Sequence, residues 1–190
     1  PRRLVRMDAP VYMAIHEVTV DQWRALSKKT HYKTEAEVGG GGYTWVDKGG
    51  WLSHEWTYEK ATDATWKNPL PGFDFIPGAD HPVTQVSWND AIAFCKHYGF
   101  ALPTELQWER ACRAGTDTRF YWGDAPAGGQ GRLNAAGADR MPKSLEFSET
   151  FPFADGYPFT SPVGSLAPNG YGLFDVLGNV WEWTSTQSGS

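Results

Sequence analysis

The chain of 190 residues has only two cysteines, Cys95 and Cys112, and neither lies in a C-x-x-C pair or near a histidine at zinc-ligand spacing. Two cysteines are too few for a disulfide framework, and this spacing does not fit a structural zinc site. The sequence also lacks any run of about 18 apolar residues, so we expect no membrane span. No signal peptide is recognisable near the N-terminus, which favours a cytoplasmic location.

Basic residues are also scarce. The chain has 17 Lys and Arg against 22 Asp and Glu, which gives a formal net charge of −5. No stretch gathers enough Lys and Arg to follow a phosphate backbone, so we do not expect a nucleic-acid partner. Large rings and turn residues are abundant instead, with 10 Trp, 10 Phe, 8 Tyr, 21 Gly and 13 Pro. This composition predicts a folded, aromatic-rich core connected by many turns, with little long helix.

Three segments combine a helix-capping residue with apolar residues at helical spacing. The caps are Thr19, Ser87 and Thr104, and they predict helices over 20–28, 88–98 and 105–113. Residues 11–15 read as a short strand because they are rich in apolar and β-forming types. Residues 31–80 show no sustained periodicity, so we expect a long ordered loop layer held by its aromatic rings. These elements together indicate an α+β fold.

Several motifs occur in a recognisable order: EVT at 17–19, HPVTQVSWNDA at 81–91, LPTELQWERA at 102–111 and NGYGLFDVLGNVWEW at 169–183. Together they resemble the formylglycine-generating enzyme (sulfatase-modifying factor) superfamily over nearly the whole chain. The resemblance implies one C-type-lectin-like α+β domain over 1–190, with short helices, a small twisted sheet and much ordered loop. It further suggests a bacterial domain without its C-terminal segment.

The superfamily serves several functions, so the fold alone does not decide the activity. Its members include copper-dependent oxidases that convert a substrate cysteine to formylglycine. It also includes iron-dependent sulfoxide synthases and the ligand-binding variable proteins of diversity-generating retroelements. The first expectation is a formylglycine-generating-enzyme-like domain; the alternative is a non-catalytic variable protein. Either reading suggests a protein or peptide as ligand, and the oligomeric state stays open.

The resemblance also bears on catalysis, because the oxidases carry their copper-binding cysteine pair C-terminal to the motif that matches 178–183. No such pair occurs in this sequence, and Cys95 and Cys112 correspond to structural cysteines of two helices. We therefore assign no catalytic and no cofactor-binding residue. If the domain is an enzyme, the expectation is a copper-dependent oxidase, with copper bound only if a missing C-terminal segment supplies the cysteines.

Calcium is the cofactor that the resemblance implies for the residues present. The first implied site uses the side chains of Asp175 and Glu182 with the backbone carbonyls of Gly178 and Val180. Carboxylate and carbonyl oxygens are the ligands that Ca²⁺ prefers. The alternative is that the two carboxylates only hydrogen-bond the backbone of the turn.

A second implied calcium site has the same mixture of ligands: the side chains of Asn134 and Asp155 and the backbone carbonyls of Ala135 and Tyr157. Residues 137–150 form an insertion between its two halves, so calcium binding and simple bracing of the turn are equally favoured for this set.

We also expect Trp108, Trp181 and Trp183 to anchor the hydrophobic core, because apolar residues and turn glycines surround them in the sequence.

Overall fold

Four helices of the computed structural model, which describes residues 9–49, 55–137 and 150–186, begin in the same way. In each, a Thr or Ser side chain accepts a hydrogen bond from the third helical residue, whose own side chain bonds back to the cap. The helices are α1 (Val20–Thr30), α2 (Glu35–Val38), α3 (Trp88–Tyr98) and α4 (Glu105–Arg113), with a 3₁₀ helix η1 at Pro126–Gly129. The capping signals therefore predicted α1, α3 and α4, and α1 continues two residues beyond its predicted end.

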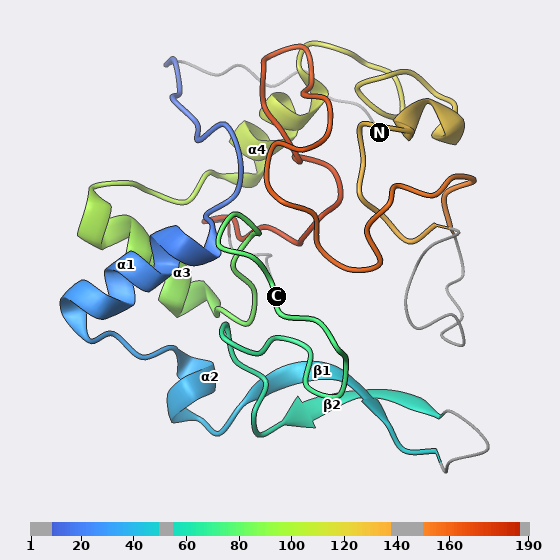
Figure 1. The fold of residues 1–190 in the computed structure, drawn as a ribbon. Helices are drawn as coiled ribbons and strands as arrows, with labels where there is room; N and C mark the ends of the chain where they lie inside the picture. Colours follow the sequence, from blue (N-terminus) through green and yellow to red (C-terminus); the bar gives the residue numbers. More distant parts are fainter. Residues whose placement is uncertain (1–8, 50–54, 138–149, 187–190) are drawn as a thin grey trace.

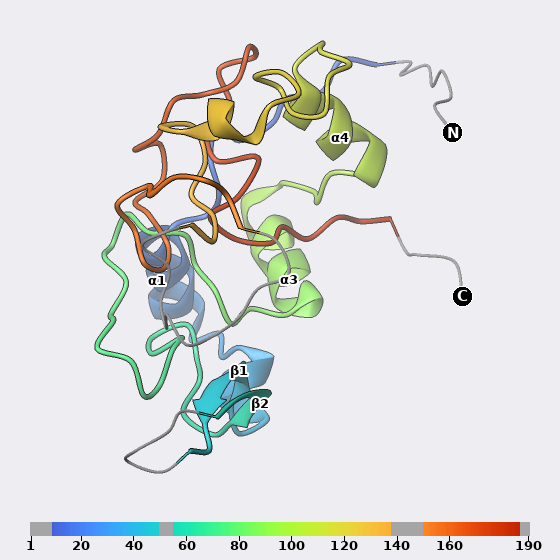
Figure 2. The same ribbon diagram turned by 90° about the vertical axis from the view of Figure 1, so that its right-hand side faces the viewer.

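The expected loop layer over 31–80 is wrong in part. It contains α2 and an antiparallel hairpin of β1 (Gly42–Asp47) and β2 (Trp56–Ala61), which projects at the lower right of Figure 1. The sequence did not predict the hairpin. Most of its residues are half-buried, so buried and exposed positions do not alternate along the two strands in the way that a strand pattern requires. Figure 2 shows it at one end of the molecule, away from α4.

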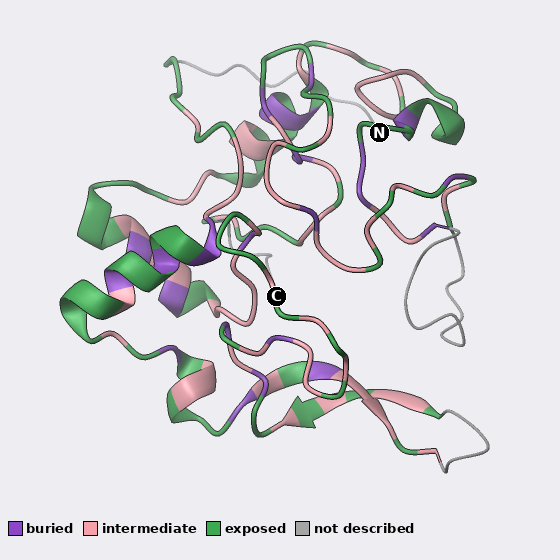
Figure 3. Cartoon of the chain, viewed as in Figure 1, coloured by how far each residue is buried: buried purple, intermediate pink, exposed green. Residues whose placement is uncertain are grey.

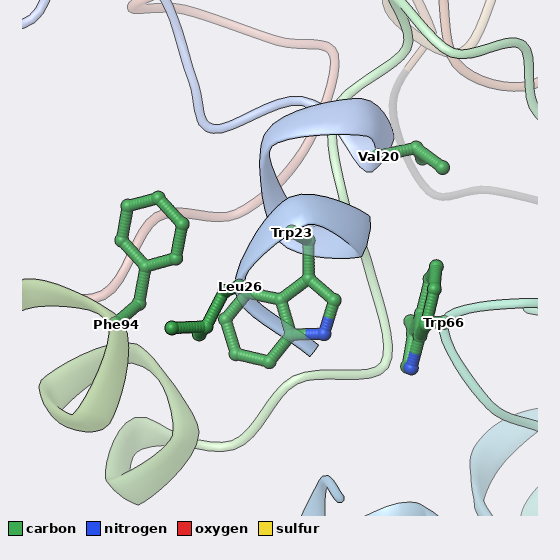
Figure 4. Packing of buried hydrophobic residues seen from close by; sticks show 5 residues of the cluster. All are labelled: Val20, Trp23, Leu26, Trp66 and Phe94. Carbon is green, nitrogen blue, oxygen red and sulfur yellow. The ribbon is translucent and has the colours of Figure 1, made fainter. Parts of the chain in front are cut away.

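The first hydrophobic cluster fills the space between α1 and α3. Trp23 of α1 is 1% exposed and stacks on Phe94 of α3, with ring centroids 5.7 Å apart and planes inclined by 11°. Val20, Leu26 and Trp66 complete the cluster (Figure 4). The apolar stripe that predicted α1 is thus the face that packs.

A buried carboxylate fixes the arrangement next to this cluster. Asp90 is fully buried and accepts hydrogen bonds from the backbone N–H of Ser87 at 2.8 Å, the hydroxyl of Tyr32 at 2.9 Å and the backbone N–H of Glu35 at 3.1 Å. These donors come from the cap of α3, the chain after α1 and the first residue of α2. Asp90 therefore caps α3 and also ties α2 to it.

The second cluster lies under α4. It consists of Ala111, Cys112, Leu173 and Val176, so α4 packs against the irregular C-terminal part of the chain. In Figure 3 the buried positions fall in both regions, with half-buried and exposed loops between them. The result is one domain of helices, a small sheet and long ordered loops.

Residues 11–15 do not form the expected strand. This stretch is mostly exposed and pairs only at its end, where the carbonyl of Ile15 accepts from the N–H of Phe174 at 2.8 Å. The chain that follows is joined to the segment before α3, because Val83 N–H donates to the carbonyl of Val18 at 2.9 Å. A strand needs a neighbouring strand to pair with, and none of the described residues pairs with 11–15 in this way. Apolar composition does not reveal whether such a partner exists.

The expectation that the three tryptophans anchor the core is wrong for two of them. Trp181 is 102% exposed and Trp183 is 48% exposed, while Trp108 is half-buried. The indole of Trp183 instead donates to the carbonyl of Val86 at 3.0 Å. The C-terminal segment also forms hydrogen bonds near the first residues of α3 and α4, at Trp88, Pro103 and Glu105, and Figure 2 shows it passing α3.

Among the described residues, no helix has the length and apolarity needed to cross a membrane.

Candidate metal centre

The chain folds back on itself between Asp175 and Glu182. Asp175 has a φ of 57°, Gly178 a φ of 88° and Asn179 a φ of 53°, so three residues adopt the left-handed conformation within one short stretch. Glycine and asparagine tolerate this conformation best, which agrees with the Gly-Asn pair that predicted a turn. Asp175 is buried, and its Oδ2 accepts a hydrogen bond from the N–H of Gly164 at 2.7 Å.

Close packing holds the tip of this turn. A Cβ on Gly178 would lie 2.2 Å from the carbonyl oxygen of Asn134, so only glycine fits there. The side chain of Asn179 forms two hydrogen bonds with Ser161, accepting from its N–H at 2.9 Å and donating to its carbonyl at 3.3 Å. The turn is therefore fixed on both sides by neighbouring loops.

Glu182 closes the turn and contacts α4. Its carboxylate accepts a hydrogen bond from the indole N–H of Trp108. The residue is exposed over much of its surface, yet the protein groups around its carboxylate raise its pKa, chiefly by removing water. The bond from Trp108 opposes this shift, and the negative charge of Asp175 adds to it. The charge of Asp175 thus acts on Glu182 across the turn.

A third carboxylate, which the sequence reasoning missed, belongs to this region. Both carboxylate oxygens of Glu17 are buried without a hydrogen-bond partner. The pKa of Glu17 is raised from 4.5 to about 8, chiefly by burial and in smaller part by the charges of Asp175 and Glu182, while hydrogen bonding to its own backbone and to the Asn179 amide acts in the opposite sense. In the sequence Glu17 stood out only as the first letter of the EVT motif, and nothing in its spacing linked it to Asp175.

The second predicted set of ligands also comes together, although residues 138–149 of the insertion between its halves lie outside the described residues. Asp155 accepts from the N–H of Ala135 at 2.8 Å through one oxygen and from the N–H of Tyr157 at 2.8 Å through the other. The side-chain amide of Asn134 donates to the carbonyl of Phe159 at 2.8 Å. Hydrogen bonds between side chains and the backbone connect the members of this set, and calcium binding and turn bracing both stay predictions there.

Side chains alone do not form a metal site in the described part of the chain, since no three His, Cys, Asp or Glu residues are placed to hold an ion together. Calcium sites also use backbone carbonyls, which is the role predicted for Gly178 and Val180. The donor types of the 175–182 turn are ones that calcium accepts: two carboxylates, of which Asp175 acts electrostatically on Glu182, and the backbone carbonyls between them.

The two cysteines do not suit a soft metal. Both are free thiols, and Cys112 is buried while Cys95 is half-buried. Burial raises the pKa of Cys112 to about 11 and raises that of Cys95 as well. Metal ligation requires the thiolate, so burial works against ligation by either residue, and their structural role stays a prediction.

Comparison with known proteins gives a consistent result along the whole chain. The family model described as "Sulfatase-modifying factor enzyme 1-like domain" matches residues 1–189. The formylglycine-generating enzyme of Bos taurus is 37% identical over 97% of this chain and 50% of that protein. That of Thermomonospora curvata is 36% identical over 96% of this chain and 61% of that protein. The chain thus spans about half the length of such relatives.

Two further similarities limit which properties of these relatives can be assigned to this chain. The Bos taurus protein named "Inactive C-alpha-formylglycine-generating enzyme 2" is 34% identical over 94% of this chain and 60% of that protein. The solved structure of PvdO from Pseudomonas aeruginosa has a TM-score of 0.53 over 90% of this chain and 54% of that chain, at 22% identity. The first similarity shows that proteins named formylglycine-generating enzyme and a protein named as its inactive form match this chain almost equally well, and the second shows the fold alone.

Proposed function

Because the chain belongs to the family of sulfatase-modifying factor enzyme 1-like domains, we propose that it is a calcium-binding, formylglycine-generating-enzyme-like domain. The C-type-lectin-like fold, with its small sheet and many ordered loops, is part of this proposal. The observation that supports the calcium assignment is the 175–182 turn, whose left-handed residues fold the chain back so that the charge of Asp175 raises the pKa of Glu182. A bound cation would relieve this repulsion.

In this proposal the side chains of Asp175 and Glu182 and the carbonyls of Gly178 and Val180 hold Ca²⁺. Calcium accepts irregular oxygen cages, whereas Mg²⁺ demands near-ideal octahedral geometry and keeps its waters. A turn with fixed backbone oxygens therefore favours calcium. The bound ion would supply a structural cross-link between the turn and α4, which Glu182 contacts through Trp108. Calcium at the second set stays a prediction, because its carboxylate already has backbone partners.

A calcium titration tests this assignment directly. Binding to the folded state stabilises it by RT ln(1 + [L]/Kd), about 2.7 kcal/mol at a hundredfold excess over Kd. Calcium should raise the melting temperature and EDTA should lower it. Glu182→Gln should lose most of this response, whereas Glu55→Gln, at an exposed position, should keep it. An unchanged calcium shift in Glu182→Gln, or no shift in the parent protein after chelation, would leave the carboxylates as turn braces only.

We further propose that residues 1–190 do not themselves convert a cysteine to formylglycine. Burial raises the pKa of both thiols, which disfavours the thiolate form, and the relatives include a protein named as inactive. Incubation with copper, a thiol reductant, oxygen and a cysteine-containing sulfatase-type peptide should give no oxidised peptide by mass spectrometry. Turnover would show that Cys95 or Cys112 has a catalytic role.

A peptide or protein is the proposed ligand of the domain. An open groove of about 840 Å³ lies between the N-terminal stretch and α4, with Met13, Arg110, Tyr171 and Leu173 in its lining. Its mixed apolar and basic character suits an extended peptide. The relatives are named as formylglycine-generating enzymes, which favours this family function over that of a retroelement variable protein.

A further inference from the structure

We propose that Arg110 makes the groove between residues 9–15 and α4 selective for peptides that carry a carboxylate group. The inference deepens the proposed function and rests on it, because that function places a peptide in this groove. It names the chemical class of the peptide, which is an acidic segment with apolar side chains beside the acid. Arg110 binds the carboxylate in this proposal, and the apolar lining binds the neighbouring side chains.

The charge of the groove lining is the first observation. Among the described residues that line the groove, Arg110 is the one that carries a charge. This positive charge lies on a chain whose formal net charge is −5. A cation in an otherwise uncharged lining favours an anionic group on the ligand. The planar guanidinium also matches a carboxylate in geometry, because it donates two parallel hydrogen bonds.

The second observation is that Arg110 has no partner. Its side chain is exposed and forms no ion pair or hydrogen bond with the described residues. Arg113 on the same helix differs, because its guanidinium bonds Glu109 at 2.9 Å and the carbonyl of Thr118 at 3.1 Å. Glu109, the acid next to Arg110 in the sequence, is thus paired with Arg113. The guanidinium of Arg110 is left for a group from outside.

The side of α4 that borders the groove provides a further donor. Gln107 and Arg110 are three residues apart, so their side chains lie on the same side of the helix. The Oε1 atom of Gln107 accepts from the N–H of Thr104 at 2.8 Å, and its amide NH₂ group has no partner among the described residues. Both free groups of this wall are hydrogen-bond donors. They suit a carboxylate, which only accepts.

The N-terminal wall of the groove suits a polypeptide. Tyr12 is fully exposed and Met13 is half-buried, so both offer apolar surface to a ligand. The backbone N–H groups of residues 11–14 donate to no backbone carbonyl of the described residues. They are open to a peptide backbone, which can add to an unpaired stretch of chain through main-chain hydrogen bonds. Figure 2 shows this stretch, in blue, running past α4.

A simpler role for Arg110 is stabilisation of α4. It lies in the last turn of the helix, where a positive charge interacts favourably with the helix dipole. The two roles predict different results for Arg110→Gln, which removes the charge and keeps a polar side chain. A helix-stabilising residue would lower the melting temperature and leave peptide binding unchanged. A carboxylate-binding residue would weaken the binding of acidic peptides and leave that of neutral peptides unchanged.

The experiment uses a panel of short synthetic peptides that combine Val and Phe with one Asp, each matched by a peptide with Asn or Lys in place of Asp. Fluorescence anisotropy of the labelled peptides measures their affinity for the parent protein, Arg110→Gln, Arg110→Glu and Arg113→Gln. We expect the parent to bind Asp peptides about tenfold more tightly than Asn peptides, because a charge-assisted hydrogen bond is stronger than a neutral one. High salt should reduce this preference.

The variants separate the charge of Arg110 from its position on the helix. Arg110→Gln should lose the preference for Asp, and Arg110→Glu should bind the Lys peptides more tightly than the Asp peptides. Arg113→Gln is the matched control on the same helix and should behave like the parent. Tyr12→Ser should weaken the binding of all the peptides, because it removes apolar surface without touching the charge.

Equal affinity of the parent for Asp and Asn peptides, or an undiminished preference in Arg110→Gln, would overturn the inference and leave the groove as a peptide site. Failure of every peptide to bind the parent would overturn the proposed peptide ligand, and the inference with it. Analytical ultracentrifugation tests whether a second copy of the chain fills the groove. A dimer formed by the parent and abolished in Arg110→Glu would overturn the assignment of a separate peptide.

Discussion

The backbone N–H of Asn179 donates to the carbonyl of Asn134 over 2.9 Å, so the two sets of predicted calcium ligands meet at one hydrogen bond. Asn134 opens the second set, and Asn179 lies at the tip of the turn that carries the first. A change that moves one set therefore moves the other. This contact explains why the turn tolerates only glycine at the preceding position, where a Cβ would strike the same carbonyl.

Gly178→Ala should destabilise the protein by more than about 2 kcal/mol, because it combines a positive φ with a backbone clash. Thermal and urea unfolding measure the loss. Gly172→Ala provides the matched control, since Gly172 also has a positive φ but has open space around its Cβ position. Equal effects of the two substitutions would show that backbone conformation alone is responsible.

The stability of the calcium-free protein should fall as the pH rises from about 4.5 to about 8. The pKa of Glu17 is raised from 4.5 to about 8, so in this window the folded state holds a proton that the unfolded state has released. The stabilising effect is complete below pH 4.5 and lost above pH 8. Urea unfolding in EDTA should show a difference of a few kcal/mol between the parent and Glu17→Gln across the window. Parallel pH profiles would contradict the buried position of this carboxylate.

Tryptophan substitutions should separate the core from the surface. Trp23→Ala should cost about 3–5 kcal/mol, because its ring is enclosed between α1 and α3. Trp181→Ala should cost less than about 1 kcal/mol, as expected for an exposed side chain. Chemical unfolding monitored by circular dichroism measures both. A large loss for Trp181→Ala would place this ring in a packed environment after all.

Thiol reagents should distinguish the two cysteines. Cys95 is half-buried and Cys112 is buried with a pKa of about 11, so Cys95 should react first and both should react slowly at pH 7.5. Mass spectrometry after timed alkylation gives the order, and unfolded protein provides the control for full reactivity. Fast labelling of Cys112 in the folded protein would contradict its structural role.

The parts of the fold that the sequence predicted are those with local signals. Thr19, Ser87 and Thr104 cap helices through contacts only three residues away, which a sequence pattern can show. The hairpin at 42–61 depends on pairing between half-buried strands, and the exposure of Trp181 depends on which surfaces meet it. Both are tertiary properties. Apolar composition does not specify them.

The same distinction applies to the candidate site. The turn that carries Asp175 and Gly178 was predictable because its residues are close in sequence and suited to left-handed backbone. Glu17 was not, because its link to the turn runs through the contact between Ile15 and Phe174. A long-range contact of this kind leaves no periodic trace in a single sequence.

Asp90 gives the fold a cooperative unit that the order of its helices does not suggest. A four-residue helix such as α2 is not stable by itself in water, yet its first backbone N–H is bonded to Asp90 at the start of α3. Glu35 and Asp90 are 55 positions apart in the sequence, yet the two helices share one carboxylate. Amide hydrogens of α2 should therefore exchange with solvent only when the start of α3 opens, so that the two segments exchange as one foldon.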